Sequence, residues 1–157
     1  MSRLVRDDAG FVAGGEALLF GVLTCVTGML IAVNAWAVVD ARGQADTAAR
    51  EAARAFVESD SQSRALQDAR SAAALSIGDI RAGQVLDVVV RSSDGGAATL
   101  ARCQRIQASV TLQVGAIAMP FLGSVGSRTV TGTHSELVDP WRSGLPASSL
   151  VGTDCDA

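Results

Sequence analysis

Few side chains in this sequence could do chemistry: there is one histidine, there are three cysteines, and there is no tyrosine. The histidine, His134, is followed by Ser135 and Glu136, so the residue types of a base, a nucleophile and an orienting acid stand together. Adjacent residues of a strand point to opposite faces, and three consecutive residues therefore cannot form a catalytic triad. We expect a structural role for His134 and no enzymatic activity.

The cysteines fall into two groups. Cys25 lies inside a long apolar run, where a thiol serves as a small packing residue. Cys103 and Cys155 both follow that run, and we expect them to form a disulfide in an oxidising compartment; the alternative is two free thiols. Such a bond would close a loop of about 50 residues and stabilise the fold by roughly 4 kcal/mol.

We expect no cofactor, metal or nucleic-acid site. A zinc site built from Cys103, Cys155 and His134 would lack the closely spaced ligand pairs that such sites use. The sequence has no phosphate-binding loop, no dinucleotide-binding glycine pattern and no paired catalytic carboxylates. A formal net charge of -3, isolated arginines and 4% aromatic residues argue against nucleic-acid binding, which needs a clustered basic face or a stacking platform.

The most informative stretch is the apolar run at residues 17–39, which contains no charged residue. A helix through it would be about 34 Å long, enough to cross a hydrocarbon core of about 30 Å. We expect a transmembrane helix over residues 16–39, preceded by a short cytoplasmic tail at 1–15 and followed by an extracytoplasmic domain at 40–157. Arginines flank both ends of the run, so this orientation rests on the short tail and the larger C-terminal domain.

Glu16, at the start of the run, has two interpretations. It is either an interfacial carboxylate that reaches water or an acid that pairs with a cationic group of a neighbouring subunit. Within the run, small residues recur at spacings of four, three and four, which places them on one helix face where another helix could approach closely. These residues are Gly21, Cys25, Gly28 and Ala32. Glycine and alanine are also common in membrane helices without a partner, so both explanations stay open.

The helical period continues beyond the apolar run. We expect one helix over residues 12–58, about 70 Å long, with Gly43 as its weakest point. The apolar face of its outer half consists of Ala45, Ala49, Ala52 and Phe56. After a break with good N-cap residues, a second, alanine-rich helix is expected over residues 62–77.

The remaining residues predict a small antiparallel sheet. Residues 84–91 are rich in β-branched side chains, and residues 106–114 alternate apolar with polar side chains, as a strand with one buried face does. We expect the stretch GAIAMPFLGSVG to break this second strand at Pro120 and residues 128–138 to form a third. The predicted fold class is α+β: a long N-terminal helix, transmembrane and then amphipathic, with the sheet packed on its outer half.

Two stretches resemble a known family. A glycine shortly before a glutamate, followed by the apolar run and AAREAAR, resembles the TadE-like family of the tight-adherence (Flp-type) pilus machinery, and HSELVDPWRSG at residues 134–144 resembles its actinobacterial members. The matching parts are residues 10–58 and 103–155. The resemblance implies a single-pass membrane protein of the cell envelope, a minor pseudopilin whose transmembrane helix contacts other pilin-like or Tad-type assembly subunits.

The resemblance also implies processing by a prepilin-type peptidase, which cuts after a glycine and leaves glutamate as the fifth residue of the mature chain. A cut after Gly10 makes Phe11 the first residue and Glu16 the sixth. Placing Glu16 fifth would instead require a cut after Phe11. In either case the resemblance implies that the acid meets the free amine of a neighbouring subunit.

Two other functions compete with pilus assembly. The first is a secreted or membrane-anchored binding module that signal peptidase cleaves after Ala37, because residues 35–37 have the A-x-A form of such a site. The apolar run is longer than the roughly 7 to 15 residues of the apolar region in a signal peptide, and the helical period continues past it, which favours a membrane span. The second, a membrane enzyme, has no residues that support it.

Overall fold

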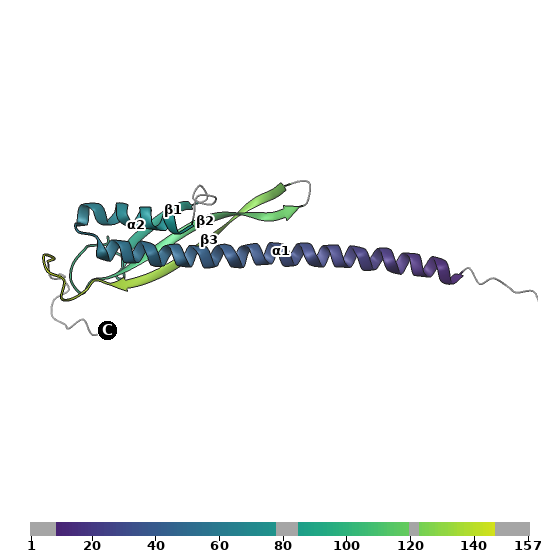
Figure 1. Cartoon of the computed structure of the whole chain (residues 1–157), viewed down its shortest axis with the longest axis horizontal. Helices are drawn as coiled ribbons and strands as arrows, with labels where there is room; N and C mark the ends of the chain where they lie inside the picture. The colour runs from purple at the N-terminus through teal and green to yellow at the C-terminus, as the bar shows by residue number, and fades with distance from the viewer. Residues whose placement is uncertain (1–8, 78–84, 120–122, 147–157) are drawn as a thin grey trace, which may run out of the picture.

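The computed structural model describes residues 9–77, 85–119 and 123–146 of the chain. Its elements are α1 (Ala9–Glu58), α2 (Gln62–Ile77), β1 (Val85–Ser92), β2 (Arg105–Met119) and β3 (Gly123–Leu137). α2 and the strands gather at the C-terminal half of α1, whose N-terminal half projects alone (Figure 1). We call residues 15–39 of α1 the rod and the chain from Asp40 onward the head. The predicted α+β class, with a sheet on the outer half of a long helix, is confirmed.

α1 is one continuous helix of 50 residues. It ends at Glu58, as predicted, and begins at Ala9, three residues before the predicted start. Gly43 does not interrupt it, and open space surrounds the position where a Cβ atom would stand. The head packs on the helix on both sides of this glycine, at Ala41 and Ala45. These contacts offset the weak intrinsic helix propensity of Gly43.

α2 has the predicted bounds and returns alongside α1 (Figure 1). The reversal occurs at residues 59–61, where the Ser59 hydroxyl donates a hydrogen bond of 2.6 Å to the Asp68 carboxylate. The backbone carbonyl of Ser61 accepts hydrogen bonds from the amides of Arg64 and Ala65 and so starts the helix. Its buried stripe is made of alanines at spacings of four: Ala65, Ala69 and Ala73.

The three strands form one antiparallel sheet in the order β1-β2-β3. The alternation predicted for residues 106–114 is confirmed, since Ile106, Ala108 and Val110 are fully buried. The second strand ends at Met119, directly before Pro120, where the break was predicted. β2 continues to Met119 and pairs with β3 from Gly123 onward, so both strands are longer than predicted. Pairing across the hairpin provides the hydrogen bonds of this stretch, whose glycines and alanines have little strand propensity of their own.

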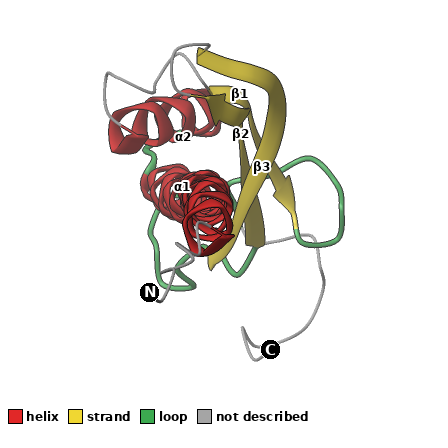
Figure 2. Ribbon diagram, turned by 90° about the vertical axis from the view of Figure 1, so that its right-hand side faces the viewer, coloured by secondary structure: helices red, strands yellow, loops and turns green. Residues whose placement is uncertain are grey.

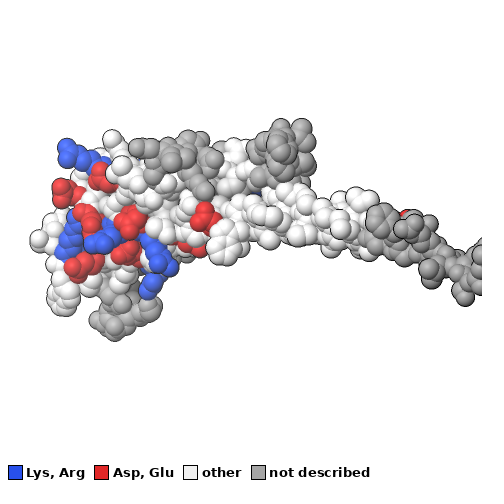
Figure 3. Space-filling model, turned by 45° about the vertical axis from the view of Figure 1, so that its right-hand side comes forward, with Lys and Arg blue, Asp and Glu red and all other residues white. Residues whose placement is uncertain are grey.

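Both helices cover the same face of the sheet, with α1 against β2 and β3 and α2 beside β1 (Figure 2). The opposite face carries polar side chains, including the exposed Gln107, Thr131 and Ser135. On the face shown in Figure 3, Asp, Glu and Arg side chains gather over the head, whereas the rod carries no charged residue after Glu16. The molecule is therefore divided along α1 into a charged, packed end and an apolar, uncovered end.

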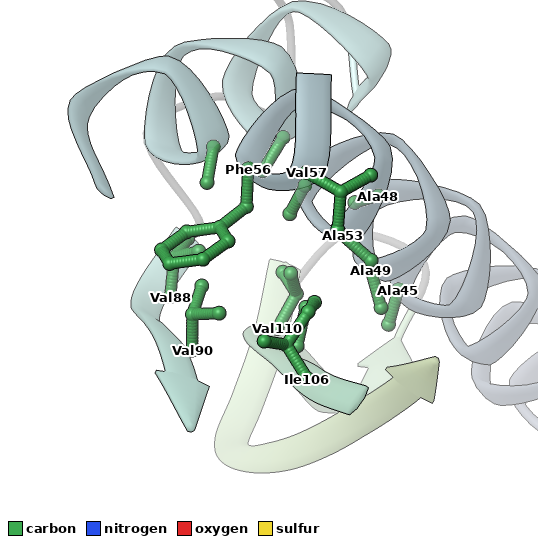
Figure 4. Close-up of a cluster of buried hydrophobic side chains, with 14 of the residues drawn as sticks. Ala45, Ala48, Ala49, Ala53, Phe56, Val57, Val88, Val90, Ile106 and Val110 are labelled. Carbon is green, nitrogen blue, oxygen red and sulfur yellow. The ribbon is translucent and has the colours of Figure 1, made fainter. Parts of the chain in front are cut away.

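The core lies between α1, α2 and the inner face of the sheet (Figure 4). Its largest fully buried side chains are Phe56, Ile106, Val110 and Val138. α1 contributes mainly alanines, and those that are no more than 1% exposed are Ala41, Ala45, Ala48, Ala49, Ala52 and Ala53. Small side chains on the helix allow close backbone approach, so the core is narrow and the sheet lies near the helix axis.

The closest approach of sheet and helix is at Gly132 of β3. A Cβ atom built on this glycine would overlap the backbone of Ala45 and Asp46 in α1. Gly132 is buried and stands opposite Val110 in the central strand. Only a residue without a side chain fits here, because the atoms it would meet belong to helix backbone that cannot move aside.

Candidate membrane span and assembly surface

The other described parts of the chain leave most of the surface of the rod uncovered. From Gly15 to Val39 its residues are exposed except for Leu30, Asn34 and Val38, which are half-buried. Large apolar side chains face outward: Phe20 is 72% exposed and Leu19 73%. A core helix of a soluble domain would be covered, whereas this helix is uncovered and is long and apolar enough to be a membrane span or a signal sequence. In both cases its apolar surface requires a lipid or protein partner.

The polar side chains of the rod bond to its own backbone. The hydroxyls of Thr24 and Thr27 each donate a hydrogen bond of 2.8 Å to the carbonyl four residues earlier. The amide of Asn34 donates one of 2.7 Å to the carbonyl of Leu30. Back-bonding of this kind satisfies polar groups without water, which is what a hydrocarbon environment demands.

The predicted small-residue stripe is fully exposed on the rod. No atom lies within 4 Å of a Cβ built on Gly21 or Gly28, and Cys25 is an exposed free thiol. The same helical line continues from Ala32 in steps of seven, four, three and four residues. It passes through Val39, Gly43, Asp46 and Arg50, which are exposed except for the half-buried Asp46, and it meets the buried core only at Ala53 and Val57, near the end of α1. Along the rod and up to Gly43 the stripe is therefore on the uncovered side of α1.

The predicted processing residues all lie in α1. Gly10 and Phe11 belong to its first turn, and their side chains lie outside the described residues. Glu16 is exposed one turn further along and stands at the start of the uncharged run. Neither the cut after Gly10 nor the pairing of Glu16 with a neighbouring amine is tested by this geometry, and both stay predictions.

Only one cysteine of the predicted disulfide lies in the described part of the chain. Cys155 lies outside the described residues, so its pairing with Cys103 stays a prediction. Cys103 has a φ of 61° in the loop before β2, and its amide donates a hydrogen bond of 3.1 Å to the carbonyl of Val138. The amide of Arg102 donates one of 3.0 Å to the carbonyl of Pro146. The segment that follows β3 is thus docked on the loop before β2 by backbone hydrogen bonds.

Arg142 has a role that the sequence analysis missed. Its guanidinium donates hydrogen bonds to the last carbonyls of α1 and the residue beyond: Val57, Glu58 at 3.0 Å and Ser59 at 2.6 Å. The C-terminal end of a helix leaves such carbonyls without hydrogen-bond partners and carries partial negative charge. An arginine stabilises this end both by donating hydrogen bonds and by its positive charge. The last turn of α1 contains no basic residue of its own. That lack is the one signal in the sequence that a distant cation was needed.

A turn in the HSELVDPWRSG stretch presents this arginine. The Asp139 carboxylate accepts a hydrogen bond of 2.8 Å from the amide of Trp141, and the carbonyl of Asp139 accepts one of 3.3 Å from the amide of Arg142. Part of the most distinctive stretch of the sequence therefore closes the head. Trp141 itself is 89% exposed.

The described part of the head keeps the candidate catalytic side chains apart. His134 is half-buried on the inner face of β3, whereas Ser135 is exposed on the outer face, so the two side chains are separated as predicted. An open cavity of about 460 Å³ is lined by Val57, Glu58, Glu136, Leu137, Asp139 and Arg142. Glu58 accepts a hydrogen bond of 2.9 Å from Arg54, and this bond raises the pKa of that exposed arginine. The described residues contain no group of three side chains placed to hold a metal ion.

No protein-family model, curated protein or solved structure matches the chain.

Proposed function

We propose that this protein is a single-pass membrane subunit of a tight-adherence-type pilus or related secretion apparatus, and that it acts in assembly as a minor pseudopilin. The observation that carries the proposal is the uncovered, apolar rod that continues without a break into the core of the head. A helix shared in this way fixes the head rigidly to its membrane anchor. That geometry suits a subunit that must pack beside others rather than a tethered domain that moves freely.

In this proposal the rod crosses the membrane and the head lies on the extracytoplasmic side. The first charged residues after the rod, Asp40 and Arg42, mark the change from an apolar to a polar environment. The change coincides with the start of the buried core at Ala41. In this proposal the membrane-spanning part of α1 therefore ends where the part that packs against the head begins.

The small-residue stripe is the surface through which the rod packs on other subunits. Along the rod it is on the uncovered side of α1, so a neighbouring helix can reach it without meeting the sheet or α2. Glu16 supports the same contact by pairing with the free amine of a neighbouring subunit, at the N-terminal end of the rod. The partners are pilin-like or Tad-type subunits, or further copies of this chain.

A second candidate function, a binding module released by signal peptidase after Ala37, is favoured by one observation. The buried core begins at Ala41, so a chain that starts at Val38 would keep the core of the head. Against this candidate, residues 35–37 lie in the middle of α1. A peptidase would have to unwind the helix before it could bind that site as an extended segment.

Photo-crosslinking in the host's own membranes tests the proposed assembly surface. A photo-reactive amino acid replaces Cys25 in the stripe or, as a matched control, the equally uncovered Leu23 on the opposite side of the rod. We expect position 25 to capture a second copy or another subunit with an N-terminal apolar helix, identified by mass spectrometry, and position 23 to capture lipid. Equal capture of protein at the two positions would show that the stripe is not the interface.

A further inference from the structure

The β2–β3 hairpin continues well past the last core contact that the structure describes. Among the residues of β2 whose side chains the structure describes, Val114 is the furthest along the strand that packs against the core, and it stands opposite Arg128 of β3. Beyond this pair the hairpin continues through residues 115–119 of β2 and 123–127 of β3. Five residues of strand add about 16 Å. We call these ten residues the free end of the hairpin.

The free end extends toward the rod. β3 passes Ala45 at Gly132, and its following segment reaches Val57 through Arg142, so β3 runs in the same direction as α1. Followed backward, the hairpin leads from the head toward the N-terminal half of the helix, as Figure 1 shows. Val38 packs against the edge of the core, as Val114 does. The free end therefore begins level with the end of the rod and continues beside it.

Partial burial on the rod agrees with this placement. Its half-buried residues are Leu30, Asn34 and Val38, which are spaced by four. They lie in line with Ala41 and Ala45, on the side of α1 that the head covers. From Val38 to Leu30 the helix rises about 12 Å, which is comparable to the reach of the free end.

Two uncharged segments thus lie beside one another. The rod has no charged residue after Glu16, and the sequence has none from Ile106 to Ser127. The nearest charges flank the pair: Asp40 and Arg42 on α1 and Arg128 on β3 are all exposed. An uncharged zone bordered by exposed charged residues, arginines among them, matches the layering of a bilayer, where lipid phosphates lie outside the hydrocarbon.

We propose that the free end of the hairpin rests in the headgroup layer of the membrane that the rod crosses, so that the head touches lipid at a second point. The inference relies on the proposed membrane span. The open strand edges of a hairpin cannot enter the hydrocarbon, because their unpaired backbone groups would have no partner there. The depth is therefore interfacial, level with the last turns of the rod. Trp36, 75% exposed, lies in those turns and is a residue type that favours this layer.

Depth-dependent fluorescence quenching tests the contact. The full chain is reconstituted in phosphatidylcholine vesicles containing phosphatidylglycerol, with one environment-sensitive dye on Cys25, or on a cysteine at Ser124 or Ser93 in the Cys25→Ala background. Cys25 reports on the rod, Ser124 on the free end and Ser93 on the exposed turn at the other end of the sheet. The quenchers are nitroxide lipids labelled near the headgroup, nitroxide lipids labelled deep in the acyl chain, and aqueous iodide.

We expect the deep lipid to quench the dye on Cys25, the shallow lipid to quench the dye at Ser124, and only iodide to quench the dye at Ser93. Iodide quenching at Ser124 equal to that at Ser93 would overturn the inference, as would protection from all three quenchers, which would mean that protein covers the hairpin. A dye on Cys25 that no lipid quenches would instead refute the membrane span itself. The two proposals therefore fail in different ways.

Paired substitutions sharpen the result. Ile117 and Val125 stand opposite each other in the free end, and Gln107 and Ser135 stand opposite each other within the head. We expect Ile117→Asp with Val125→Asp to abolish lipid quenching at Ser124 and to leave quenching at Cys25 unchanged. The control pair Gln107→Asp with Ser135→Asp places the same charges on the exposed sheet face and should leave both unchanged. Equal effects of the two pairs would contradict a contact made by the free end.

Discussion

In a water-soluble helix the large apolar side chains are normally buried, and the two halves of α1 show the opposite arrangement. In residues 15–39 large apolar side chains face outward, whereas in residues 40–58 the buried face consists almost entirely of alanine. The covered half needs small residues because β3 and α2 approach its backbone closely. The uncovered half needs large ones because its partners lie outside the chain. Along one continuous helix, the half that is buried within the fold therefore has small side chains, and the half that is exposed has large apolar ones.

The comparison predicts that the head depends on small residues and the rod on apolar ones. Gly132→Ala should give the largest loss, since its methyl group would overlap the α1 backbone, and we expect about 3 kcal/mol or more of destabilisation. Chemical denaturation of the detergent-solubilised protein measures this. Membrane retention of the folded fraction should be unchanged. A loss below about 1 kcal/mol would mean that β3 and α1 are not in close contact.

Val26→Arg should have the reverse effect. An arginine near the centre of a membrane helix costs about 3 kcal/mol of insertion free energy, so we expect a large fall in the share of protein that resists alkaline extraction. Val26 is 50% exposed and touches no part of the core, so the unfolding transition of the head should not move. Thr47→Arg, an exposed site on the other half of α1, is the control. If both variants extract alike, the rod does not cross a bilayer.

Arg142→Ala should destabilise the head to an intermediate extent. It removes the donors of the Val57, Glu58 and Ser59 carbonyls, and we expect a loss of about 1 to 2 kcal/mol, measured by denaturation. Arg70→Ala, at an exposed site on α2, should cost less than about 0.5 kcal/mol. Equal effects of the two substitutions would remove the case for a helix cap.

Gly43→Ala should have the smallest effect, and a favourable one. Open space surrounds this position on α1, so the substitution adds helix propensity without a clash and should stabilise the protein by roughly 0.5 to 1 kcal/mol. It is the matched counterpart of Gly132→Ala, since the same methyl group is added in both. A destabilising result would show that a neighbour or a bend uses the exposed glycine.

Local patterns predicted the elements well. The 3.6-residue period gave the C-terminal end of α1 at Glu58 and both ends of α2, and alternation gave the buried positions of β2. These features depend on near neighbours in the sequence. The rod is likewise recognised from its own residues, because they are mostly apolar and none after Glu16 is charged.

Features that depend on distant residues escaped prediction. Gly132 has the sequence context of an ordinary strand glycine, and only the position of Ala45, 87 residues earlier, explains it. Arg142 lies 83 to 85 residues from the carbonyls that it caps. The extension of β2 to Met119 was missed because glycine and alanine suggest a loop, and pairing across the hairpin outweighs that tendency.

The central claim is that the rod remains attached to the head and lies in a membrane. The direct test is alkaline extraction of the host's membranes, followed by intact mass and N-terminal sequencing of the protein. We predict a membrane-retained chain that still contains the rod; a start at Phe11 or Val12 would identify prepilin-type processing, and a start at Met1 or Ser2 a permanent anchor. A soluble chain that starts at Val38 would contradict the account and establish the released module in its place.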